Sequence, residues 1–406
     1  MQTIETQQSY AFEGLDGAGK TTIITMLVED LEALGLRVAV NSSPGKTWTG
    51  HVLKECMAHI EPNKKNELFT YDIRRTERTI PHTVNMVLWD RHLDSVVVSN
   101  GDDANEEVAK YAEGIVRPHI VIYLDISPDI SWERESKNTD HPLDTDWLRA
   151  KHRRYHELMI DDATPDARSG GKFVIFDASK PLEKVYASVR DYFLKEAGPF
   201  IERNKAMYEL LLETPGIIQF LLDNPVEVKP DVYLPMFVNL KNTWSTPDVR
   251  STIVHNLAQL VDEDIDWIIG LESGGSYYAV ALANMLGKPV SLLRKNAKEH
   301  GNNSYLVGEA PPVGSKVVLV DDVYATGQSA SRALEQLASN NCRCSLVTIF
   351  SYSNDKEIQD RLGISGTALT YFKGILHRAK EKGLLNVEQA TEVTKHVDKY
   401  RNTRFT

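Results

Sequence analysis

The sequence predicts an α/β protein with two domains, each built on a parallel sheet that is covered by helices. The chain has 406 residues, more than a single ordinary hydrophobic core accommodates. Short apolar runs alternate with amphipathic stretches, a pattern typical of parallel sheets. The alternation stops at residues 196–199 and restarts near residue 226. We therefore divide the chain into residues 1–197, residues 198–370 and a polar, largely helical extension at residues 371–406. This extension is expected to be a surface extension or a contact element.

The elements of the first domain follow from the spacing of its apolar residues. The runs expected to be strands are residues 9–12, 36–41, 86–89, 119–124 and 172–176. The stretches expected to be helices are residues 21–34, 143–160 and 182–195.

The second domain begins with a helical stretch at residues 200–222, interrupted near Pro215 and Gly216. Its expected strands are residues 232–239, 267–270, 290–293, 316–320 and 345–350. The two halves carry different motifs, so the sequence favours a fusion over a duplication.

Composition limits the class of protein. A net charge of −11 argues against a broad nucleic-acid-binding surface. No apolar run approaches the roughly 20 residues that span a bilayer, and the N-terminus does not resemble a secretory signal. The spacing of the three cysteines suits neither a disulfide framework nor a four-ligand zinc site, which fits a reducing compartment. We therefore expect a cytoplasmic protein with no membrane partner. We identify no metal-ligand partners in sequence for His92, His119, His152 and His156, and expect structural or surface roles for them.

The segment GLDGAGKTT at residues 14–22 matches the pattern G-x-x-x-x-G-K-[ST] between an expected strand and an expected helix. Its glycines allow backbone N–H groups to surround a phosphate, and the helix adds its positive end. Lys20 is expected to reach the β- and γ-phosphates of a nucleotide, and Thr21 to bind Mg²⁺. The predicted nucleotide-binding residues are Gly14, Asp16, Gly17, Ala18, Gly19, Lys20, Thr21 and Thr22.

Residues 8–195 resemble the thymidylate kinase family. The motifs that carry the resemblance are FEGLDGAGKTT, WDRHLDS at residues 89–95, PHIVIYLDISP at 118–128 and FDASKPLEKV at 176–185. The resemblance implies that ATP donates its γ-phosphoryl group to a nucleoside monophosphate. It implies that Asp16 and Phe69 contact the sugar and base of this acceptor, and that Arg91 holds its phosphate. The other implied site residues are Asp90 on the metal, Arg74 and Asn100 near the base, and Arg134 and Lys137 in a mobile lid.

The acceptor side departs from the family pattern. The family's Arg-Glu-Pro-Gly-Gly-Thr loop is replaced by residues 42–47, SSPGKT, so a cation and a carboxylate are missing. The family's Ala-Tyr-Gln-Gly becomes residues 98–101, VSNG. The acceptor therefore stays open between dTMP and another monophosphate.

The segment VVLVDDVYATGQS at residues 317–329 places two carboxylates at the end of an expected strand, beside a loop that can hold a phosphate. Asp321 and Asp322 can accept hydrogen bonds from two ribose hydroxyls. The loop residues predicted to bind the phosphate are Tyr324, Ala325, Thr326, Gly327, Gln328 and Ser329. A sugar phosphate matches both parts of the segment.

Residues 200–370 resemble the type I phosphoribosyltransferases, and the segment LLRKNAKEHG at residues 292–301 is similar to the mobile loop of the orotate branch. The resemblance implies phosphoribosyl pyrophosphate as donor, Mg²⁺ on Asp321 and Asp322, and a homodimer. The residues implied on pyrophosphate are Ser273, Gly274, Gly275, Arg294, Lys295, Lys298 and His300. Those implied on the base are Lys229 and Phe237.

The base side departs here as well, because the arginine expected after the strand at residues 345–350 is absent and Lys229 is followed by Pro230 and Asp231. The base therefore stays open between orotate and a related pyrimidine. Taken together, the sequence favours a bifunctional enzyme of pyrimidine nucleotide metabolism. The alternative is a regulatory protein that senses nucleotides or phosphoribosyl pyrophosphate, with one or both domains inactive.

Overall fold

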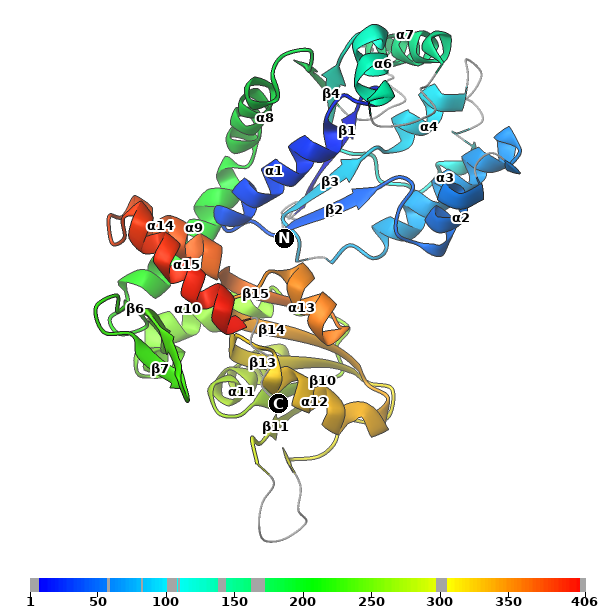
Figure 1. The fold of residues 1–406 in the computed structure, drawn as a ribbon. Coiled ribbons are helices and arrows are strands. Elements are labelled where there is room, and N and C mark those ends of the chain that lie inside the picture. Colours follow the sequence, from blue (N-terminus) through cyan, green and yellow to red (C-terminus); the bar gives the residue numbers. More distant parts are fainter. Residues whose placement is uncertain are drawn as a thin grey trace. The chain divides into compact units, whose positions relative to one another are not determined.

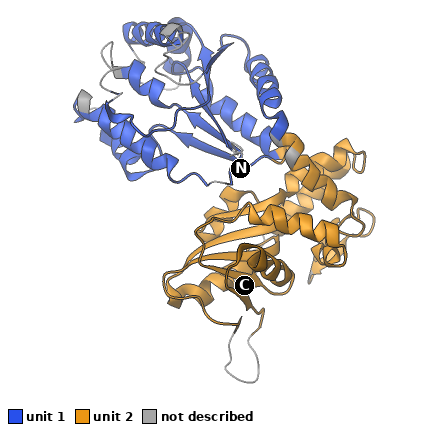
Figure 2. Cartoon of the chain, turned by 180° about the vertical axis from the view of Figure 1, so that it is seen from behind, with its two compact units in different colours: residues 1–32, 36–200 blue, residues 33–35, 201–406 orange. Residues whose placement is uncertain are grey.

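A computed structural model describes residues 7–56, 59–81, 83–100, 108, 110–137, 144–161, 172–296 and 305–401. The chain divides into two compact units (Figure 2). Unit 1 comprises residues 1–32 and 36–200, and unit 2 comprises residues 33–35 and 201–406. The exact boundaries expected at residues 197 and 370 stay predictions.

Unit 1 is built on a parallel sheet with the strand order β2-β3-β1-β4-β5. The strands are β1 (Gln8–Glu13), β2 (Val38–Ser42), β3 (Met86–Asp90), β4 (Ile120–Asp125) and β5 (Lys172–Asp177). Figure 1 shows α1 and α8 on one side of this sheet and α3 and α4 on the other. The helices are α1 (Lys20–Ala33), α2 (Trp48–Cys56), α3 (Pro62–Glu77), α4 (Leu93–Asn100), α6 (Pro128–Ser136), α7 (Thr145–Asp161) and α8 (Leu182–Glu196). All five expected strands and the three expected helices are confirmed.

Unit 2 is built on a sheet with the order β12-β11-β10-β13-β14-β15, in which only the pair β11–β12 is antiparallel. Its strands are β10 (Trp267–Leu271), β11 (Val290–Leu293), β12 (Leu306–Val307), β13 (Lys316–Tyr324), β14 (Arg343–Ser351) and β15 (Gly366–Tyr371). Two small antiparallel pairs, β6–β9 and β7–β8, lie outside it. They consist of β6 (Ile218–Phe220), β7 (Val226–Lys229), β8 (Val232–Leu234) and β9 (Met236–Val238).

The helices of unit 2 cover both faces of its main sheet. They are α9 (Gly198–Glu213), α10 (Pro247–Ala258), α11 (Gly274–Leu286), α12 (Gln328–Leu337), α13 (Asp355–Leu362), α14 (Phe372–Glu381) and α15 (Val387–Arg401). Alternate residues of β13 point to opposite faces: Val318 and Val320 pack in one core cluster with α10 and α11, and Val317 and Leu319 in another with α12 and α13. Both faces are apolar because both are covered.

Several details predicted for residues 200–406 are wrong. The helix expected to reach residue 222 ends at Glu213, and β6 follows it. The single strand expected at residues 232–239 is two strands with different partners, because Pro235 between them has no N–H to donate. Helices α14 and α15 are helical as expected, but they are not a surface extension, because Ile375 and Val393 are fully buried in the core of unit 2. The other expectation, a contact element, stays a prediction.

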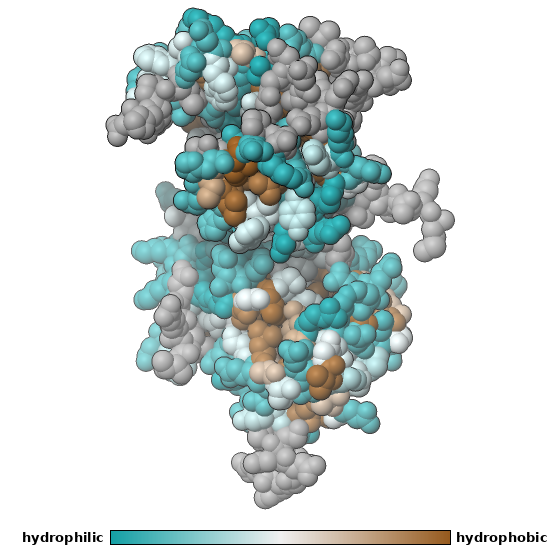
Figure 3. Space-filling view, turned by 90° about the vertical axis from the view of Figure 1, so that its right-hand side faces the viewer, coloured by the Kyte–Doolittle hydropathy of each residue, from teal (hydrophilic) through white to brown (hydrophobic). Residues whose placement is uncertain are grey.

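The face drawn in Figure 3 is mainly hydrophilic, with small hydrophobic areas. The most exposed large apolar side chains, Trp48, Val313 and Val387, come from different elements. Among the described residues, no helix is long and apolar enough to cross a membrane.

Candidate active sites

The glycine loop of unit 1 lies between β1 and α1, and its conformation requires glycine. Gly14, Gly17 and Gly19 all have positive φ angles, of 139°, 74° and 87°. A Cβ atom on Gly14 would also lie 2.5 Å from the carbonyl oxygen of Leu124. Side chains are therefore excluded where the loop turns, and the chain enters α1 directly at Lys20.

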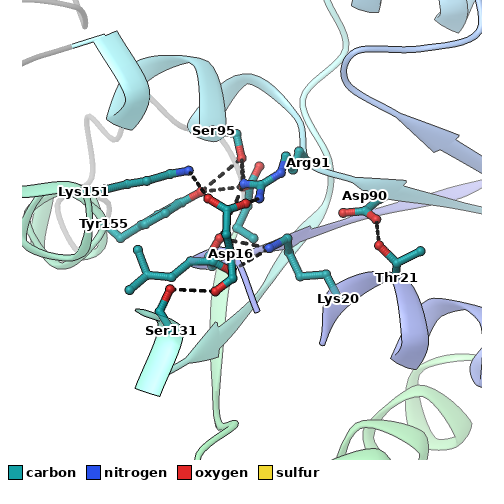
Figure 4. Close-up of polar contacts among 12 residues, drawn as sticks. Asp16, Lys20, Thr21, Asp90, Arg91, Ser95, Ser131, Lys151 and Tyr155 are labelled. Carbon is teal, nitrogen blue, oxygen red and sulfur yellow. Dashed lines mark hydrogen bonds and ion pairs between the residues drawn. The ribbon is translucent and has the colours of Figure 1, made fainter. Parts of the chain in front are cut away.

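Lys20 is buried, and its ammonium group donates hydrogen bonds to loop carbonyls. The distances from Nζ are 3.1 Å to Gly14 O and 2.8 Å to Leu15 O. Burial and the positive charge of Arg91 lower the pKa of Lys20 to about 7. The hydroxyl of Thr21 donates to the carboxylate of Asp90, so the two residues predicted to bind Mg²⁺ are in contact (Figure 4).

Asp16 forms ion pairs with two cations. Arg91 contacts one of its carboxylate oxygens, and Lys151 Nζ lies 3.4 Å from the other. Burial opposes ionisation, but Arg91, Lys151 and Lys20 lower the pKa of Asp16 to about 2. Figure 4 shows Lys151 reaching Asp16 from α7. This contact of Lys151 was not predicted from the sequence.

A buried carboxylate, Glu13, organises the end of β3 beside this group. It accepts hydrogen bonds from the backbone N–H of His92 at 2.7 Å, from the Tyr155 hydroxyl at 2.8 Å, and from the Ser95 hydroxyl. Arg91 precedes His92 and has a φ angle of 72°. The Glu13 contacts hold this unusual turn, which directs the Arg91 guanidinium toward Asp16.

Helix α6 contacts the glycine loop. Arg134 donates to Gly17 O and to Ala178 O, both at 3.1 Å, and the Ser131 hydroxyl donates to Asp16 O at 2.7 Å. Lys137 forms an ion pair with Glu133 at 2.8 Å. Of the two predicted lid residues, Arg134 therefore contacts the glycine loop, whereas the contact of Lys137 is with Glu133.

These residues surround a cleft of about 670 Å³. Its lining includes five cationic side chains and three carboxylates, so an anionic ligand is favoured. The cations are Lys20, Lys54, Arg91, Arg134 and Lys137, and the carboxylates are Asp16, Asp90 and Glu135. The altered loop also lines it, through Ser42, Ser43 and Pro44.

Two residues predicted to meet the acceptor base do not line this cleft. Phe69 is partly buried against the core around Trp89. Arg74 donates to the carbonyl oxygens of Tyr111 and Glu113, both at 2.7 Å, and lines a separate pocket of about 620 Å³. The side chain of Asn100 lies outside the described residues. The base contacts of these three residues stay predictions.

In unit 2 the two aspartates lie within β13, which continues to Tyr324 rather than ending at Val320 as expected. Strand β10 pairs with β13 only as far as Val320, whereas β14 pairs with it to Tyr324. Asp321 and Asp322 thus extend beyond the end of the neighbouring strand β10. This is the carboxyl edge of the parallel sheet, where ligands bind in such folds.

The first residues of α11 pack directly against these aspartates. A Cβ atom on Gly274 would lie 1.8 Å from Asp322 Oδ2, and one on Gly275 would lie 2.1 Å from Val320 O. Ser273 is the N-cap residue of α11. The close approach depends on both glycines, and it brings the positive end of α11 to the two carboxylates.

The two carboxylates interact with each other. Asp322 N donates to Asp321 Oδ1 and Val323 N donates to Asp322 Oδ1, both at 2.9 Å. Burial and the charge of Asp322 raise the pKa of Asp321 well above its usual range. A divalent cation would stabilise the doubly ionised pair.

The loop after β13 turns into α12 through Gly327, whose φ angle is 77°. Arg361 Nη1 donates to Thr326 O at 3.0 Å and so supports this loop, a contact that the sequence did not predict. The buried Tyr324 hydroxyl has no hydrogen-bond partner among the described residues. Phosphate binding by this loop and the start of α12 stays a prediction.

The basic loop is described only at its beginning. Arg294 N donates to Tyr305 O at 2.8 Å, and Lys295 N donates to Glu272 Oε2 at 3.1 Å. Lys298 and His300 lie outside the described residues, as does the side chain of Lys229. Phe237 lies in β9 opposite Gln219.

The chain thus has two α/β domains, each with a glycine-containing loop between a strand and a helix, and family comparisons identify both domains as transferases. Residues 12–189 match the family model of thymidylate kinase, and residues 246–368 match that of the phosphoribosyl transferase domain. The first part of the chain thus belongs to the thymidylate kinase family and the second part to the phosphoribosyltransferases, with relatives among the orotate phosphoribosyltransferases.

Relatives match one half of the chain each. A probable thymidylate kinase of Archaeoglobus fulgidus is 33% identical over 195 residues, which cover 44% of this chain and 91% of that protein. An orotate phosphoribosyltransferase of Bacillus anthracis is 30% identical over 157 residues, covering 37% and 74%. The orotate phosphoribosyltransferase of Pyrobaculum islandicum is 27% identical over 199 residues, covering 48% and 100%.

Proposed function

We propose that this protein catalyses two reactions of pyrimidine nucleotide synthesis. Unit 1 transfers the γ-phosphoryl group of ATP to a nucleoside monophosphate, dTMP or a close analogue. Unit 2 joins ribose 5-phosphate from phosphoribosyl pyrophosphate to orotate or a related base. The single observation that carries the proposal is the presence of two independent glycine loops, each adjoined by carboxylates suited to a divalent cation.

The kinase assignment is supported by the groups around the cleft of unit 1. Phosphoryl transfer needs positioning and positive charge more than covalent chemistry. Lys20 and Arg134 supply cations at the glycine loop, and Arg91 supplies one on the side of Asp16. Thr21 and Asp90 offer oxygen ligands, which Mg²⁺ prefers. These two residues would hold the ion, which would neutralise phosphate charge when bound.

The transferase assignment is supported by the groups at the edge of the sheet of unit 2. Displacing pyrophosphate from C1 of ribose leaves negative charge on the leaving group and positive charge on the sugar. Backbone N–H groups at the start of α11 and the cations Arg294 and Lys295 suit the leaving group. Asp321 and Asp322 fit Mg²⁺ through their oxygens, and the ion would supply charge neutralisation and a template.

A panel of acceptors tests both assignments on the intact chain. Pyrophosphate release is measured with orotate and related bases, and ADP formation with dTMP and other monophosphates. Lys20→Ala should abolish ADP formation and leave pyrophosphate release unchanged, whereas Asp321→Asn should do the reverse. ADP formation that survives Lys20→Ala contradicts the phosphate role of Lys20.

The alternative function, a sensor of nucleotides or phosphoribosyl pyrophosphate, predicts ligand binding without turnover. Isothermal titration with each ligand, run beside the activity panel, separates the two functions. Tight binding with no product from any base or monophosphate would favour the sensor.

A further inference from the structure

We propose that unit 1 holds a transition-metal site formed by Asp125, His152 and His156. Asp125 is the last residue of β4, and the two histidines lie one helical turn apart on α7. The three side chains form a group whose ligand atoms all lie within 4.8 Å of one another. None of them takes part in the proposed phosphoryl transfer. The proposal adds metal binding to the structural or surface roles expected of both histidines.

The positions of the ligand atoms fit a four-coordinate ion. His152 Nε2 lies 3.0 Å from Asp125 Oδ1 and 3.2 Å from His156 Nε2, and His156 Nε2 lies 3.7 Å from Asp125 Oδ1. With bonds of about 2.0–2.1 Å, the ligands of tetrahedral Zn²⁺ are separated by roughly 3.3 Å. The three ligand atoms form a triangle, and the point equidistant from them lies inside it, about 1.9 Å from each. An ion about 0.7 Å above the plane of this triangle would therefore have bonds of about 2.0–2.1 Å.

Neighbouring residues hold the three ligand side chains in position but leave the site open to solvent. The backbone oxygen of Asp125 accepts a hydrogen bond from Ala178 N at 2.8 Å, which holds the end of β4 in place. The ring of the fully buried Tyr123 meets that of His156 edge to face, with centroids 5.9 Å apart. The side chains of Asp125, His152 and His156 keep exposed fractions of 33%, 26% and 42%, so an ion and a water ligand can reach them.

The ligand types select the kind of metal. Two imidazole nitrogens and one carboxylate suit Zn²⁺, Co²⁺, Ni²⁺ or Cu²⁺, whereas Mg²⁺ and Ca²⁺ prefer oxygen ligands. The site is therefore chemically distinct from the oxygen pairs Thr21–Asp90 and Asp321–Asp322. We assign it to Zn²⁺ by ligand set and geometry.

A bound ion would join α7 to the end of β4. The same turn of α7 carries Lys151 and Tyr155, which contact Asp16 and Glu13. The site is thus placed to hold α7 against the sheet, in a structural role.

Cobalt substitution tests the site on the intact, metal-stripped chain. One equivalent of Co²⁺ should produce the strong visible bands of a four-coordinate ion, and Zn²⁺ should remove them by displacement. His156→Gln and His152→Gln should each weaken Co²⁺ binding by more than the roughly 10–100-fold that loss of an outer partner costs. The matched control is His396→Gln, because His396 is a similarly exposed histidine paired with Glu392 one helical turn away.

In a second experiment, excess Mg²⁺ is added to the Co²⁺-loaded chain and should leave the cobalt bands unchanged. The proposal is overturned if the wild type shows no bands, if either histidine variant matches the wild type, or if Mg²⁺ displaces the ion. Far-ultraviolet circular dichroism of each variant checks that the fold is retained. A variant that unfolds is replaced by Asp125→Asn, for which the same loss of binding is expected.

Discussion

Replacing Gly274 and Gly275 by alanine, one at a time, tests how α11 is held against β13. The new Cβ at position 275 would lie 2.1 Å from Val320 O and 2.7 Å from the Cα atom of Asp321, which are both backbone atoms. The new Cβ at position 274 would lie 1.8 Å from the carboxylate of Asp322, which is a side chain that can rotate. The two substitutions should therefore differ in cost.

The expected magnitudes follow from these contacts. Gly275→Ala forces α11 or β13 to move, and overpacking of this kind costs about 1–3 kcal/mol. Gly274→Ala requires rotation of Asp322, which breaks its 2.9 Å hydrogen bond with Val323 N and costs about 1 kcal/mol. Because that cost arises through Asp322, it should largely disappear in an Asp322→Ala background.

Amide hydrogen exchange on the intact chain measures these effects locally, since a two-domain protein has no single unfolding free energy. Amides of β10 and β13 should exchange faster in Gly275→Ala than in Gly274→Ala, and those of β1 should not change. Gly198→Ala is the control, because a Cβ atom there meets nothing within 4 Å. Equal exchange in the two variants, or an undiminished Gly274→Ala effect in the Asp322→Ala background, would refute the packing argument.

Three further predictions concern the stability and the phosphoryl transfer of unit 1. The pKa of Lys20 is lowered to about 7 in the folded chain, so between about pH 7 and 10.5 the unfolded state binds the extra proton and stability rises with pH. The free energy of local opening, measured by amide hydrogen exchange of β1 at about pH 7 and about pH 9.5, should rise less in Lys20→Met than in the wild type. Glu13→Gln turns an amide toward hydrogen-bond donors and should lower the stability of unit 1 by about 1–3 kcal/mol, measured by amide hydrogen exchange of β1 and β3; unchanged exchange would contradict the role given to Glu13. Arg134→Ala should lower the kcat of ADP formation about 10²-fold or more, whereas an unchanged kcat would remove Arg134 from the catalytic machinery.

Local patterns predicted the strands that carry both sites. The runs at residues 86–89 and 316–320 are apolar because helices cover both faces of each sheet, so a buried strand is recognisable without its partners. The glycine loop was recognisable for a similar reason, since Gly14 and Gly19 are demanded by the backbone itself. Strand β15 was missed although its residues are buried, because they lack a distinctive apolar run.

Contacts between distant segments could not be predicted. Lys151 meets Asp16 across 135 residues, and Tyr155 meets Glu13 across 142. Nothing in the helical spacing of α7 indicates which side chains face the sheet edge rather than solvent. The cluster of Asp125 with His152 and His156 escaped for the same reason, although the i, i+4 spacing of the histidines was a usable signal.

Two of the altered residues of unit 1, Ser42 and Ser43, line the cleft, so they bear on the choice of acceptor. Ser42 lines the cleft where the family pattern has arginine, and its hydroxyl donates only to Pro44 O at 2.9 Å. Ser42→Arg would restore a cation there. A charge-assisted hydrogen bond to the acceptor phosphate contributes about 1.5–3 kcal/mol. The KM for dTMP should therefore fall by roughly 10–100-fold, measured from initial rates of ADP formation.

A control separates a specific contact from the general effect of added charge. Ser188→Arg adds the same charge at an exposed position on α8 that does not line the cleft. Its KM for dTMP should equal that of the wild type. If both arginine variants lower KM equally, the effect is long-range attraction, which would also weaken with salt. If neither does, the loop at residues 42–47 does not face the acceptor phosphate, and acceptor choice depends on other residues of the cleft.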